Sequence, residues 1–273
     1  WSCVFPPAAP ITSLRRTFIL APPWTHPILL AIDAGNTNIV FAVFDGATLK
    51  ARWRLNTDSE RTADEYAVWL RQLLSLENMS FADIADAIIC SVVPPALRNL
   101  RELCRHYLKC TPLIVEAGGA DGGIPIRIDK PSSVGADRIA NAVGAHARFG
   151  GPLIVIDFGT ATTLDVIAAD GGYEGGIIAP GVNLSVKALT MAAAKLPDIA
   201  IAPPPSVIGR TTEHAMQSGV FLGYVAMIEG LVGRIKDVLG TPVTVIATGG
   251  LAPLFEARTE AIDHVDDTVT IDG

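Results

Sequence analysis

Two phrases of the sequence could hold a phosphate group together with a metal ion. Residues 29–39 and residues 153–164 each run from an apolar strand into an aspartate, Asp33 or Asp157, then through a glycine and small polar side chains into another strand. A carboxylate fixed at a strand end can bind Mg²⁺ directly or through water. The glycine lets backbone N–H groups approach an anion. The repeated phrase therefore predicts two matched loops that face each other across a cleft and hold a metal-bound polyphosphate.

Uncharged donors for phosphate oxygens follow both aspartates, namely Asn36, Thr37, Thr160, Thr162 and Thr163. Neither phrase is a P-loop or a dinucleotide-binding fingerprint, because those motifs have more glycines and run into a helix. The alternative is a pair of ordinary hairpins, in which Asp, Gly, Asn and Thr are common turn formers. Two copies at matching positions of two similar halves favour the functional interpretation.

A third phrase, Ile-Ala-Thr-Gly-Gly at residues 246–250, ends a predicted strand with two glycines. Gly249 and Gly250 would let a flat purine and its ribose lie against the backbone. A plain strand-to-helix turn accounts for the same residues equally well. The phrase therefore supports a nucleotide site only in combination with the two aspartate loops.

A fourth phrase, residues 133–138, opens a predicted helix whose N-terminus favours a bound anion. Asp137 could accept a proton from an attacking hydroxyl, and Arg138 could bind a carboxylate. The alternative is the usual chemistry of a helix start with a surface ion pair, and spacing alone favours that alternative. The phrase is thus a candidate site for a small acid that carries a hydroxyl.

The predicted elements around these phrases form two similar halves that join near a helix over residues 136–148. In the first half, Thr62 and Glu65 predict a capping box at a helix start. That half is predicted to contain strands 28–32, 39–44, 51–55, 87–93 and 113–115, helices from 62 and from 94, and a glycine-rich connection 117–123. The second half is predicted to contain strands 153–156, 164–168, 175–178 and 243–247, a helix 182–194, a long bent helix 212–238, and a helical stretch from 253.

The composition limits the classes of partner. The chain has 273 residues, 49% of them hydrophobic, which is enough for one large domain or two smaller ones. Its net charge of −7 argues against non-specific nucleic-acid binding, which needs a basic surface. The four cysteines contain no Cys-x-x-Cys pair, so we expect reduced packing residues and no structural zinc at Cys3, Cys90, Cys104 and Cys110.

Two further segments bear on location and assembly. Residues 1–27, rich in proline, predict a disordered extension, with a cleaved targeting segment as the alternative. The longest later apolar run, residues 220–228, is too short to span a bilayer, so no membrane segment is expected. A strip of small residues, Gly219, Gly223, Ala226 and Gly230, predicts close helix packing in the core or, alternatively, a dimer seam or hinge.

With these phrases the chain resembles the actin, hexokinase and Hsp70 superfamily and, within it, the type III pantothenate kinases. The resemblance covers nearly all of the sequence from Ile28 onward. It is carried by residues 33–37, 91–94, 135–138, 157–162, 175–181 and 249–250. It implies an α/β fold of two similar ribonuclease H-like domains, residues 28–149 and 150–273, with a cleft between them.

The resemblance also implies roles for particular residues. The first phosphate-binding loop for ATP would consist of Asp33, Ala34, Gly35, Asn36, Thr37, Asn38, Ile39 and Val40. Thr160 would contact ATP as well, beside the glycines predicted to accept its purine. Pantothenate would bind to Gly135, Ala136, Asp137, Arg138 and Thr212, with Asp137 as the catalytic base. Asp33 would hold Mg²⁺, and Asp157 would lie at a monovalent cation site for K⁺ or NH₄⁺.

The implied activity is ATP-dependent phosphorylation of pantothenate to 4'-phosphopantothenate, the first step of coenzyme A synthesis, by a cytoplasmic homodimer. The alternatives are a non-catalytic regulator that keeps the ATP-binding fold, and a phosphatase or ATPase of the same superfamily. The sequence departs from the family pattern at Ile128, where many members have a tyrosine near the substrate. The family also usually continues past Gly273 with a short helix, so a truncated sequence is expected.

Overall fold

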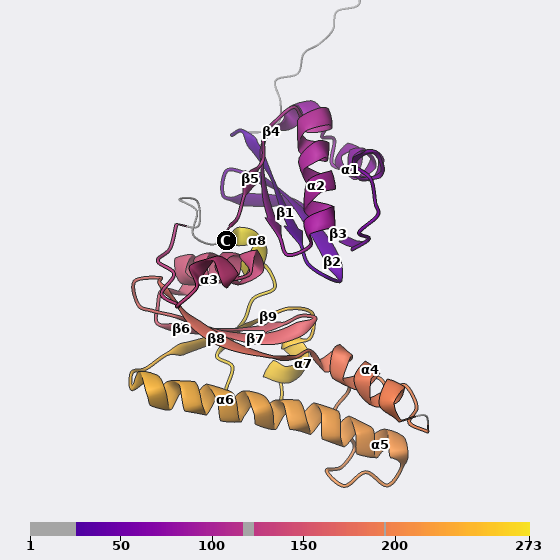
Figure 1. The fold of residues 1–273 in the computed structure, drawn as a ribbon, viewed down its shortest axis with the longest axis vertical. Coiled ribbons are helices and arrows are strands. Elements are labelled where there is room, and N and C mark those ends of the chain that lie inside the picture. Colours follow the sequence, from indigo (N-terminus) through magenta and orange to yellow (C-terminus); the bar gives the residue numbers. More distant parts are fainter. Residues whose placement is uncertain (1–25, 117–122, 194) are drawn as a thin grey trace, which may run out of the picture.

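Two five-stranded sheets of the same topology form the centre of the structure (Figure 1). A computed structural model describes residues 26–116, 123–193 and 195–273. The first sheet has the order β3-β2-β1-β4-β5, with β1 Ile28–Ala34, β2 Asn38–Asp45, β3 Thr48–Asn56, β4 Ile84–Ser91 and β5 Leu113–Ile114. The second has the order β10-β9-β6-β7-β8, with β6 Leu153–Phe158, β7 Ala161–Ile167, β8 Tyr173–Pro180, β9 Thr244–Thr248 and β10 His264–Val265.

The strand pairing repeats from one sheet to the other. In each sheet three successive strands form antiparallel pairs, β1 with β2 and β2 with β3, or β6 with β7 and β7 with β8. Two later strands then add in parallel, β4 and β5 beside β1, and β9 and β10 beside β6. The predicted repetition of the two halves is therefore confirmed at the level of sheet topology.

Helices form three layers around the two sheets (Figure 1). The outer face of the first sheet is covered by α1 Ala63–Leu76 and α2 Pro94–Leu103. Between the sheets lie α3 Ala136–Phe149 and α8 Val269–Asp272. The outer side of the second sheet carries α5 Thr212–Gln217, α6 Gly223–Leu239 and α7 Ala252–Glu256, and α4 Val182–Ala192 extends beside α5.

The alternation of side chains along a strand decides which residues face the middle layer. In β6, Val155 packs in the cluster that contains Ile139 of α3, whereas Ile154 and Ile156 pack in the cluster that contains Ile228 of α6. Asp157 is two residues from Val155 and so faces the α3 side. The period of two along a strand thus aims this aspartate at the middle layer.

The same alternation operates in the first sheet. Leu30 and Ile32 of β1 pack in the cluster of α1 and α2, whereas Ala31 lies in a small cluster with Ile271 of α8. Asp33 is two residues from Ala31 and therefore also faces the middle layer. Aspartates at equivalent positions in the two sheets point toward each other from opposite sides of α3 and α8.

Most predicted elements occur, with shifted bounds. Thr62 and Glu65 form the predicted capping box of α1. β4 runs over Ile84–Ser91, three residues earlier than predicted at its start, and β7 begins at Ala161 because the turn before it is tighter than expected. The sequence analysis did not anticipate α8 or β10. Ala194, the last residue of one predicted helix, and most of the glycine-rich connection lie outside the described residues.

The predicted extension over residues 1–27 also lies outside the described residues, except for His26 and Pro27. The backbone N–H of His26 donates a hydrogen bond of 2.9 Å to Oδ1 of Asp45. The division into domains at residues 149 and 150 stays a prediction. The packing of α8 against α3 joins the two proposed halves.

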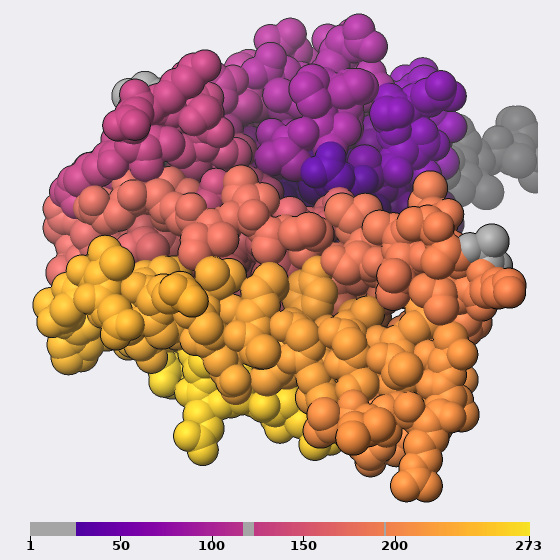
Figure 2. All heavy atoms as spheres, turned by 60° about the horizontal axis from the view of Figure 1, so that its bottom comes forward, coloured from indigo at the N-terminus to yellow at the C-terminus, as the bar shows by residue number. Residues whose placement is uncertain are grey.

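The long predicted helix is present as α5, a π-helical turn over Ser218–Leu222, and α6. Its small-residue strip is exposed, because a side-chain carbon added at Gly219, Gly223 or Gly230 would meet nothing within 4 Å. The prediction that the strip packs in the core is therefore wrong. The helix, drawn in orange, crosses the face of the molecule that Figure 2 brings forward.

By length and composition, the continuous helix Thr212–Leu239 could cross a membrane, so the prediction based on residues 220–228 alone was too narrow. One side of this helix nevertheless packs against the second sheet through Phe221, Tyr224 and Ile228. Core helices of soluble proteins pass the same test of length and composition. The expected lack of a membrane partner and the cytoplasmic location stay predictions.

Cys90, Cys104 and Cys110 are free, as predicted, and Cys90 and Cys104 are buried. Cys3 lies outside the described residues. Burial raises the pKa of the Cys104 thiol to about 12, with a smaller contribution from the nearby Cys110. Cys104 is therefore a neutral packing residue at physiological pH.

Candidate functional site

The turns between β1 and β2 and between β6 and β7 are each closed by the N–H of a glycine. In the first turn the N–H of Gly35 donates to the carbonyl of Asn38 at 3.0 Å, and in the second the N–H of Gly159 donates to the carbonyl of Ala161 at 3.0 Å. A tight turn of this kind leaves the small polar side chains around it at the surface. Both turns can therefore present hydroxyl and amide groups to a ligand.

The tips of the two hairpins lie together. Oγ1 of Thr37 and Oγ1 of Thr160 are 2.9 Å apart, although 123 residues separate them in the sequence. Both side chains are exposed. A phosphate group at this point would find hydroxyl donors from both hairpins, as the repeated phrase predicts.

The aspartates behind these turns repel one another. Burial, together with the charges of Asp137 and Asp157, raises the pKa of Asp33 to about 7. Burial and the charges of Asp137 and Asp165 raise the pKa of Asp157 to about 6. A hydrogen bond of 3.1 Å from Nδ2 of Asn141 to Oδ2 of Asp157 opposes this rise. The region therefore holds more negative charge than its own donors neutralise.

A cation would relieve this repulsion. Among the described residues, no group of three or more His, Cys, Asp or Glu side chains is placed to hold a metal ion unaided. Asp33 and Asp157 could each supply carboxylate oxygens, and the other ligands would then be phosphate oxygens, backbone carbonyls and water. Mg²⁺ often binds proteins in this way, through one or two carboxylates. The donor set thus fits a cation that arrives with a phosphate ligand.

Cys90, at the end of β4, lies beside Asp33 and forms a hydrogen bond with it. Burial and the negative charges of Asp33 and Asp137 raise the pKa of the Cys90 thiol well above its usual value. The thiol is therefore a neutral and weak donor to Asp33. The sequence analysis treated Cys90 only as a packing residue, and no sequence signal tied it to this aspartate.

The N-terminus of α3 brings the fourth phrase to the same place. Gly135 is the N-cap residue, and a side-chain carbon added there would lie 2.5 Å from Oδ1 of Asp137. This oxygen accepts the backbone N–H of Arg138 at 2.8 Å. Ala136 is buried against Cys90 and fixes the helix start on β4. A glycine at position 135 therefore makes room for the carboxylate of Asp137 over the first turn.

Arg138 is paired with a carboxylate of the protein itself. Its Nε donates to Oδ1 of Asp165 at 2.7 Å, and the hydroxyl of Tyr173 donates to the same oxygen at 2.8 Å. The sequence analysis missed Asp165, although a charged residue inside the apolar strand β7 was an available signal. Any ligand carboxylate at Arg138 would thus share the guanidinium with Asp165.

Gly249 brings the end of β9 against the second hairpin. It has a left-handed φ of 90°, and a side-chain carbon added there would lie 2.9 Å from Oδ1 of Asp157. Thr248 and Asp157 are partners in the parallel pairing of β9 with β6. The exposed Gly250 follows. The glycine pair therefore lies next to Asp157, where the sequence analysis expected part of a nucleotide site.

Thr212 is not brought to these residues within one chain. It opens α5, on the opposite face of the second sheet from α3 (Figure 1). There it lines a separate groove of about 500 Å³ together with Ser185, Leu189, Leu196, Ala215, Met216, Gly219, Val220 and Tyr224. The predicted grouping of Thr212 with Gly135 and Arg138 therefore does not occur within a single copy of the chain.

Ile128, the departure from the family pattern, lies beside β8. A side-chain carbon added at Gly175 would be 3.5 Å from Cγ2 of Ile128. Its segment is held in place because the N–H of Arg127 donates to the carbonyl of Tyr173 at 2.8 Å. Ile128 thus packs at the edge of the cluster that contains Ile139 of α3.

The C-terminal segment reaches Asp157 through two hydrogen bonds that the sequence analysis missed. The hydroxyl of Thr270 donates to Oδ1 of Asn141 at 2.6 Å, and Nδ2 of Asn141 donates to Asp157. Asn141 is fully buried. A close fit between α3 and α8 makes this chain of contacts possible, since a side-chain carbon at Gly144 would lie 2.1 Å from the carbonyl oxygen of Val269.

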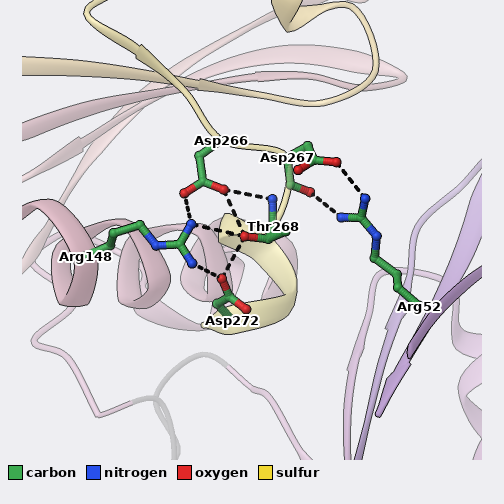
Figure 3. Close-up of polar contacts among 6 residues, drawn as sticks. All are labelled: Arg52, Arg148, Asp266, Asp267, Thr268 and Asp272. Carbon is green, nitrogen blue, oxygen red and sulfur yellow. Dashed lines mark hydrogen bonds and ion pairs between the residues drawn. The ribbon is translucent and has the colours of Figure 1, made fainter. Parts of the chain in front are cut away.

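Ion pairs hold this segment from two sides, as Figure 3 shows. Arg52 of β3 donates to Oδ2 of Asp267 at 2.6 Å and to its carbonyl at 3.1 Å. Arg148, at the end of α3, pairs with both Asp266 and Asp272. The segment thereby connects the first sheet, α3 and the second hairpin.

Comparison with solved structures defines the class of fold. A protein from Sinorhizobium meliloti, described provisionally as a 2-dehydro-3-deoxygalactonokinase, matches with a TM-score of 0.54 and 15% identity over 89% of this chain and 94% of that one. A Campylobacter jejuni protein, assigned provisionally to the Baf family of transcriptional activators, matches with a TM-score of 0.55 and 19% identity over 88% of this chain and 92% of that one. The chain shares the α/β fold of these two proteins.

Comparison of sequences narrows the class to one family. The family model of type III pantothenate kinase matches residues 29–234. The type III pantothenate kinase of Paramagnetospirillum magneticum is 60% identical over 246 residues, which cover 90% of this chain and 95% of the relative. That of Caulobacter vibrioides is 57% identical over 248 residues, with the same shares covered. This chain belongs to the type III pantothenate kinase family.

Proposed function

We propose that this chain transfers the terminal phosphoryl group of ATP to the primary hydroxyl of pantothenate and forms 4'-phosphopantothenate, in the first step of coenzyme A synthesis. Family membership supports this activity. The structural observation that carries it is the approach of Asp33, Asp137 and Asp157 from two sheets and the intervening helix. Few structural reasons exist for three carboxylates to converge, because each raises the cost of ionising the others.

The nucleotide would lie between the two hairpins. Residues 33–40 would surround its phosphates, with Thr37 and Thr160 donating to them from opposite sides. Gly249 and Gly250 would accept the ribose and purine, since no side chain covers the backbone there. Asp33 would hold Mg²⁺ and Asp157 a monovalent cation, K⁺ or NH₄⁺. The bound metal would neutralise charge on the transferred phosphoryl group.

The acceptor would lie at the start of α3. Asp137 would take the proton from the attacking hydroxyl, and the backbone of Gly135 and Ala136 would present the positive end of the helix to it. Arg138 would bind the carboxylate of pantothenate. The enzyme would lower the barrier mainly by alignment and charge neutralisation, with no covalent intermediate on the protein.

A second copy of the chain would complete the acceptor site. Thr212 lies on the opposite face of the second sheet from α3, so it could touch pantothenate only as a residue of a partner. The exposed strip of Gly219, Gly223 and Gly230 offers a surface on which two helices could approach closely. Both observations support a homodimer formed through α5 and α6.

A coupled assay of ADP release tests the proposed function. With pantothenate and K⁺, ADP should form and mass spectrometry should show one added phosphoryl group per pantothenate. Replacement of K⁺ by Na⁺ should lower the rate if Asp157 serves a monovalent cation. Asp137→Asn should reduce kcat by about 10²-fold or more, because a general base contributes 10²–10⁴-fold.

The same assay separates the alternatives. ADP release that does not depend on pantothenate would indicate an ATPase or phosphatase. Nucleotide binding without turnover on any condition would indicate a non-catalytic regulator. Near-normal turnover of Asp137→Asn would reject Asp137 as the base but leave the proposed reaction in place.

A further inference from the structure

Asp165 of β7 is a buried charge in the middle layer. Its side chain is 0% exposed, and it lies one residue after Leu164, which packs on the α6 side. It therefore faces α3, on the same side of the sheet as Asp157. A buried carboxylate costs several kcal/mol unless it is paired and hydrogen-bonded. We therefore expect Asp165 to have a positively charged partner.

The partner is Arg138. Oδ1 of Asp165 accepts Nε of Arg138 at 2.7 Å and the hydroxyl of Tyr173 at 2.8 Å, while Oδ2 accepts the hydroxyl of Thr163 at 3.2 Å. Each of these three groups donates its hydrogen bond to Asp165. Arg138 therefore supplies the counter-charge of this buried carboxylate.

The guanidinium of Arg138 is held on its remaining sides as well. It lies over the ring of Tyr173, with Cζ 5.5 Å from the ring centroid. A side-chain carbon added at Gly176 would lie 2.8 Å from Nη2 of Arg138, so a larger residue there would displace the guanidinium. The Arg138 side chain is only 15% exposed. Its position is thus fixed before any ligand binds.

One donor of this fixed guanidinium is unused. Nη2 lies 2.5 Å from Oδ1 of Asp165, so Asp165 contacts the edge of the guanidinium that Nε and Nη2 form. Nη1, in contrast, is not buried and has no hydrogen-bond acceptor among the described residues. Nη1 therefore has an unused donor. An anionic oxygen of a ligand would satisfy it. The residue before Arg138 is Asp137, the proposed base.

We propose that Asp165 is a positioning residue that fixes Arg138 to receive the carboxylate of the acceptor, and so selects acceptors that carry one. The proposal rests on the proposed function. Asp165 holds the edge of the guanidinium that Nε and Nη2 form and leaves Nη1 for the ligand. Because the side chain is already ordered, the acceptor does not bear the entropy cost of ordering it.

The test compares pantothenate with its primary amide, which keeps the hydroxyl and lacks the charged carboxylate. In Asp165→Asn, kcat/KM for pantothenate should fall by about 10–100-fold, mainly through KM, as expected when a charged hydrogen-bonding pair loses its alignment. For the amide, kcat/KM should fall by less than about 3-fold, and the KM for ATP should stay the same. Equal losses on both acceptors would show a merely structural role and overturn the proposal.

Asp170→Asn is the matched control. Asp170 also pairs with an arginine, Arg127, but its side chain is 57% exposed, on the turn between β7 and β8. Its loss should change neither acceptor's kcat/KM, because an exposed ion pair contributes little. A loss confined to pantothenate in this control would assign the selectivity to general charge effects and contradict the proposal.

If Asp165→Asn does not fold, Tyr173→Phe tests whether Asp165 positions Arg138. It removes one hydrogen bond to Asp165 and keeps the ring under Arg138. It should lower kcat/KM for pantothenate by about 2–5-fold more than for the amide. An unchanged ratio would overturn the proposal. A wild-type enzyme that phosphorylates neither acceptor would reject the proposed function, and this inference with it.

Discussion

The hairpins β1–β2 and β6–β7 share their topology and a turn closed by the N–H of a glycine, although the first turn is one residue longer. They support their aspartates differently. Asp157 accepts a hydrogen bond from the buried amide of Asn141, which Thr270 holds from its other side. Asp33 has the thiol of Cys90 as its neighbour. An amide N–H is a better donor to an anion than a neutral thiol. Burial and neighbouring carboxylates raise the pKa of Asp33 to about 7 and that of Asp157 to about 6, and the Asn141 amide opposes the rise at Asp157.

This difference shows how a duplicated element can take two roles. Asp157 receives an amide hydrogen bond from α3, which α8 supports and which partly offsets the rise in its pKa. Asp33 depends more on a bound cation to stay ionised, because its own donors compensate its charge less. The difference fits the proposed division, in which Asp33 serves the divalent metal of the nucleotide and Asp157 a monovalent cation.

The largest effect should separate the two aspartates by activity. Asp33→Asn should lower kcat by about 10²–10³-fold, the loss typical of removing a group that stabilises transition-state charge. Asp157→Asn should lower kcat by a smaller factor and should abolish the increase in rate with K⁺. Steady-state kinetics with K⁺ titrated from zero would measure both. Equal losses with an unchanged K⁺ response would contradict the division of roles.

Removing the hydrogen bond that Asn141 donates to Asp157 should leave both aspartates without an amide donor. Asn141→Ala should lower the free energy of unfolding by about 1–3 kcal/mol, because it leaves a buried carboxylate and the hydroxyl of Thr270 without partners. It should also raise the K⁺ concentration needed for half-maximal rate. Urea denaturation measures the first effect and kinetics the second.

Thr270→Val should also lower the free energy of unfolding, by about 0.5–1.5 kcal/mol, since one hydrogen bond is lost. It should raise the K⁺ concentration needed for half-maximal rate as well. Thr259→Val is the control, because it removes hydrogen bonds with Glu229 of α6 and with the N–H of Ala261, none of which touches Asp157, Asn141 or Thr270. The control should leave the K⁺ dependence unchanged. An equal shift in K⁺ dependence for both variants would indicate a general loss of stability.

The pH dependence of stability should distinguish Asp33 from Asp157 in enzyme freed of metal by EDTA. A raised carboxyl pKa means that the folded state binds the proton more tightly, so stability falls as pH rises from about 4 to the folded value near 7. Asp33→Asn should therefore have a higher Tm than wild type at pH 8, by about 2–4 °C for each kcal/mol of repulsion removed. The gain should vanish near pH 4.

Asp157→Asn should show a smaller gain in Tm over wild type, because the pKa of Asp157 is raised less than that of Asp33. This gain should reach its full size once the pH exceeds about 6. Differential scanning fluorimetry at pH 4, 6 and 8 measures both variants. A larger gain for Asp157→Asn than for Asp33→Asn would break the comparison between the hairpins.

The smallest effect is expected at the link from the first sheet to the C-terminal segment. Arg52→Ala removes the ion pair with Asp267, which is partly exposed, and should lower stability by less than about 1 kcal/mol at low salt. The difference should shrink at 1 M salt. Arg54→Ala, two residues along the same face of β3, is the control. An effect of Arg52→Ala well above 1 kcal/mol would show that the segment carries more of the contact between the sheets.

Local patterns predicted much of the fold. The capping box of α1, the apolar strands and the tight turns depend on neighbours in sequence, so Thr62, Glu65 and Gly35 could be interpreted directly. The short elements α8 and β10 were missed because they have too few residues to show a period. Their stability comes from packing, as in the contact between Gly144 and Val269.

The residues of the candidate site also divide into those that local sequence patterns identified and those that depend on tertiary contacts. Asp33, Asp137 and Asp157 were found because each stands in a recognisable phrase at a strand end or a helix start. Asp165 and Asn141 were missed because their partners lie 27 and 16 residues away and belong to other elements. Thr212 was grouped with the acceptor site, but the sheet separates it from α3 in one chain.

The sequence by itself determined two matched hairpins, each with an aspartate at the end of its first strand, because periodicity and turn chemistry act over a few residues. Only the tertiary structure decided which charges meet. Because the two sheets stack around α3 and α8, the charges of Asp33 and Asp157 interact. The same stacking pairs Arg138 with Asp165 and brings Thr270 within hydrogen-bond distance of Asn141. Electrostatic and hydrogen-bonding partners depend on distance in space, which the order of residues does not specify.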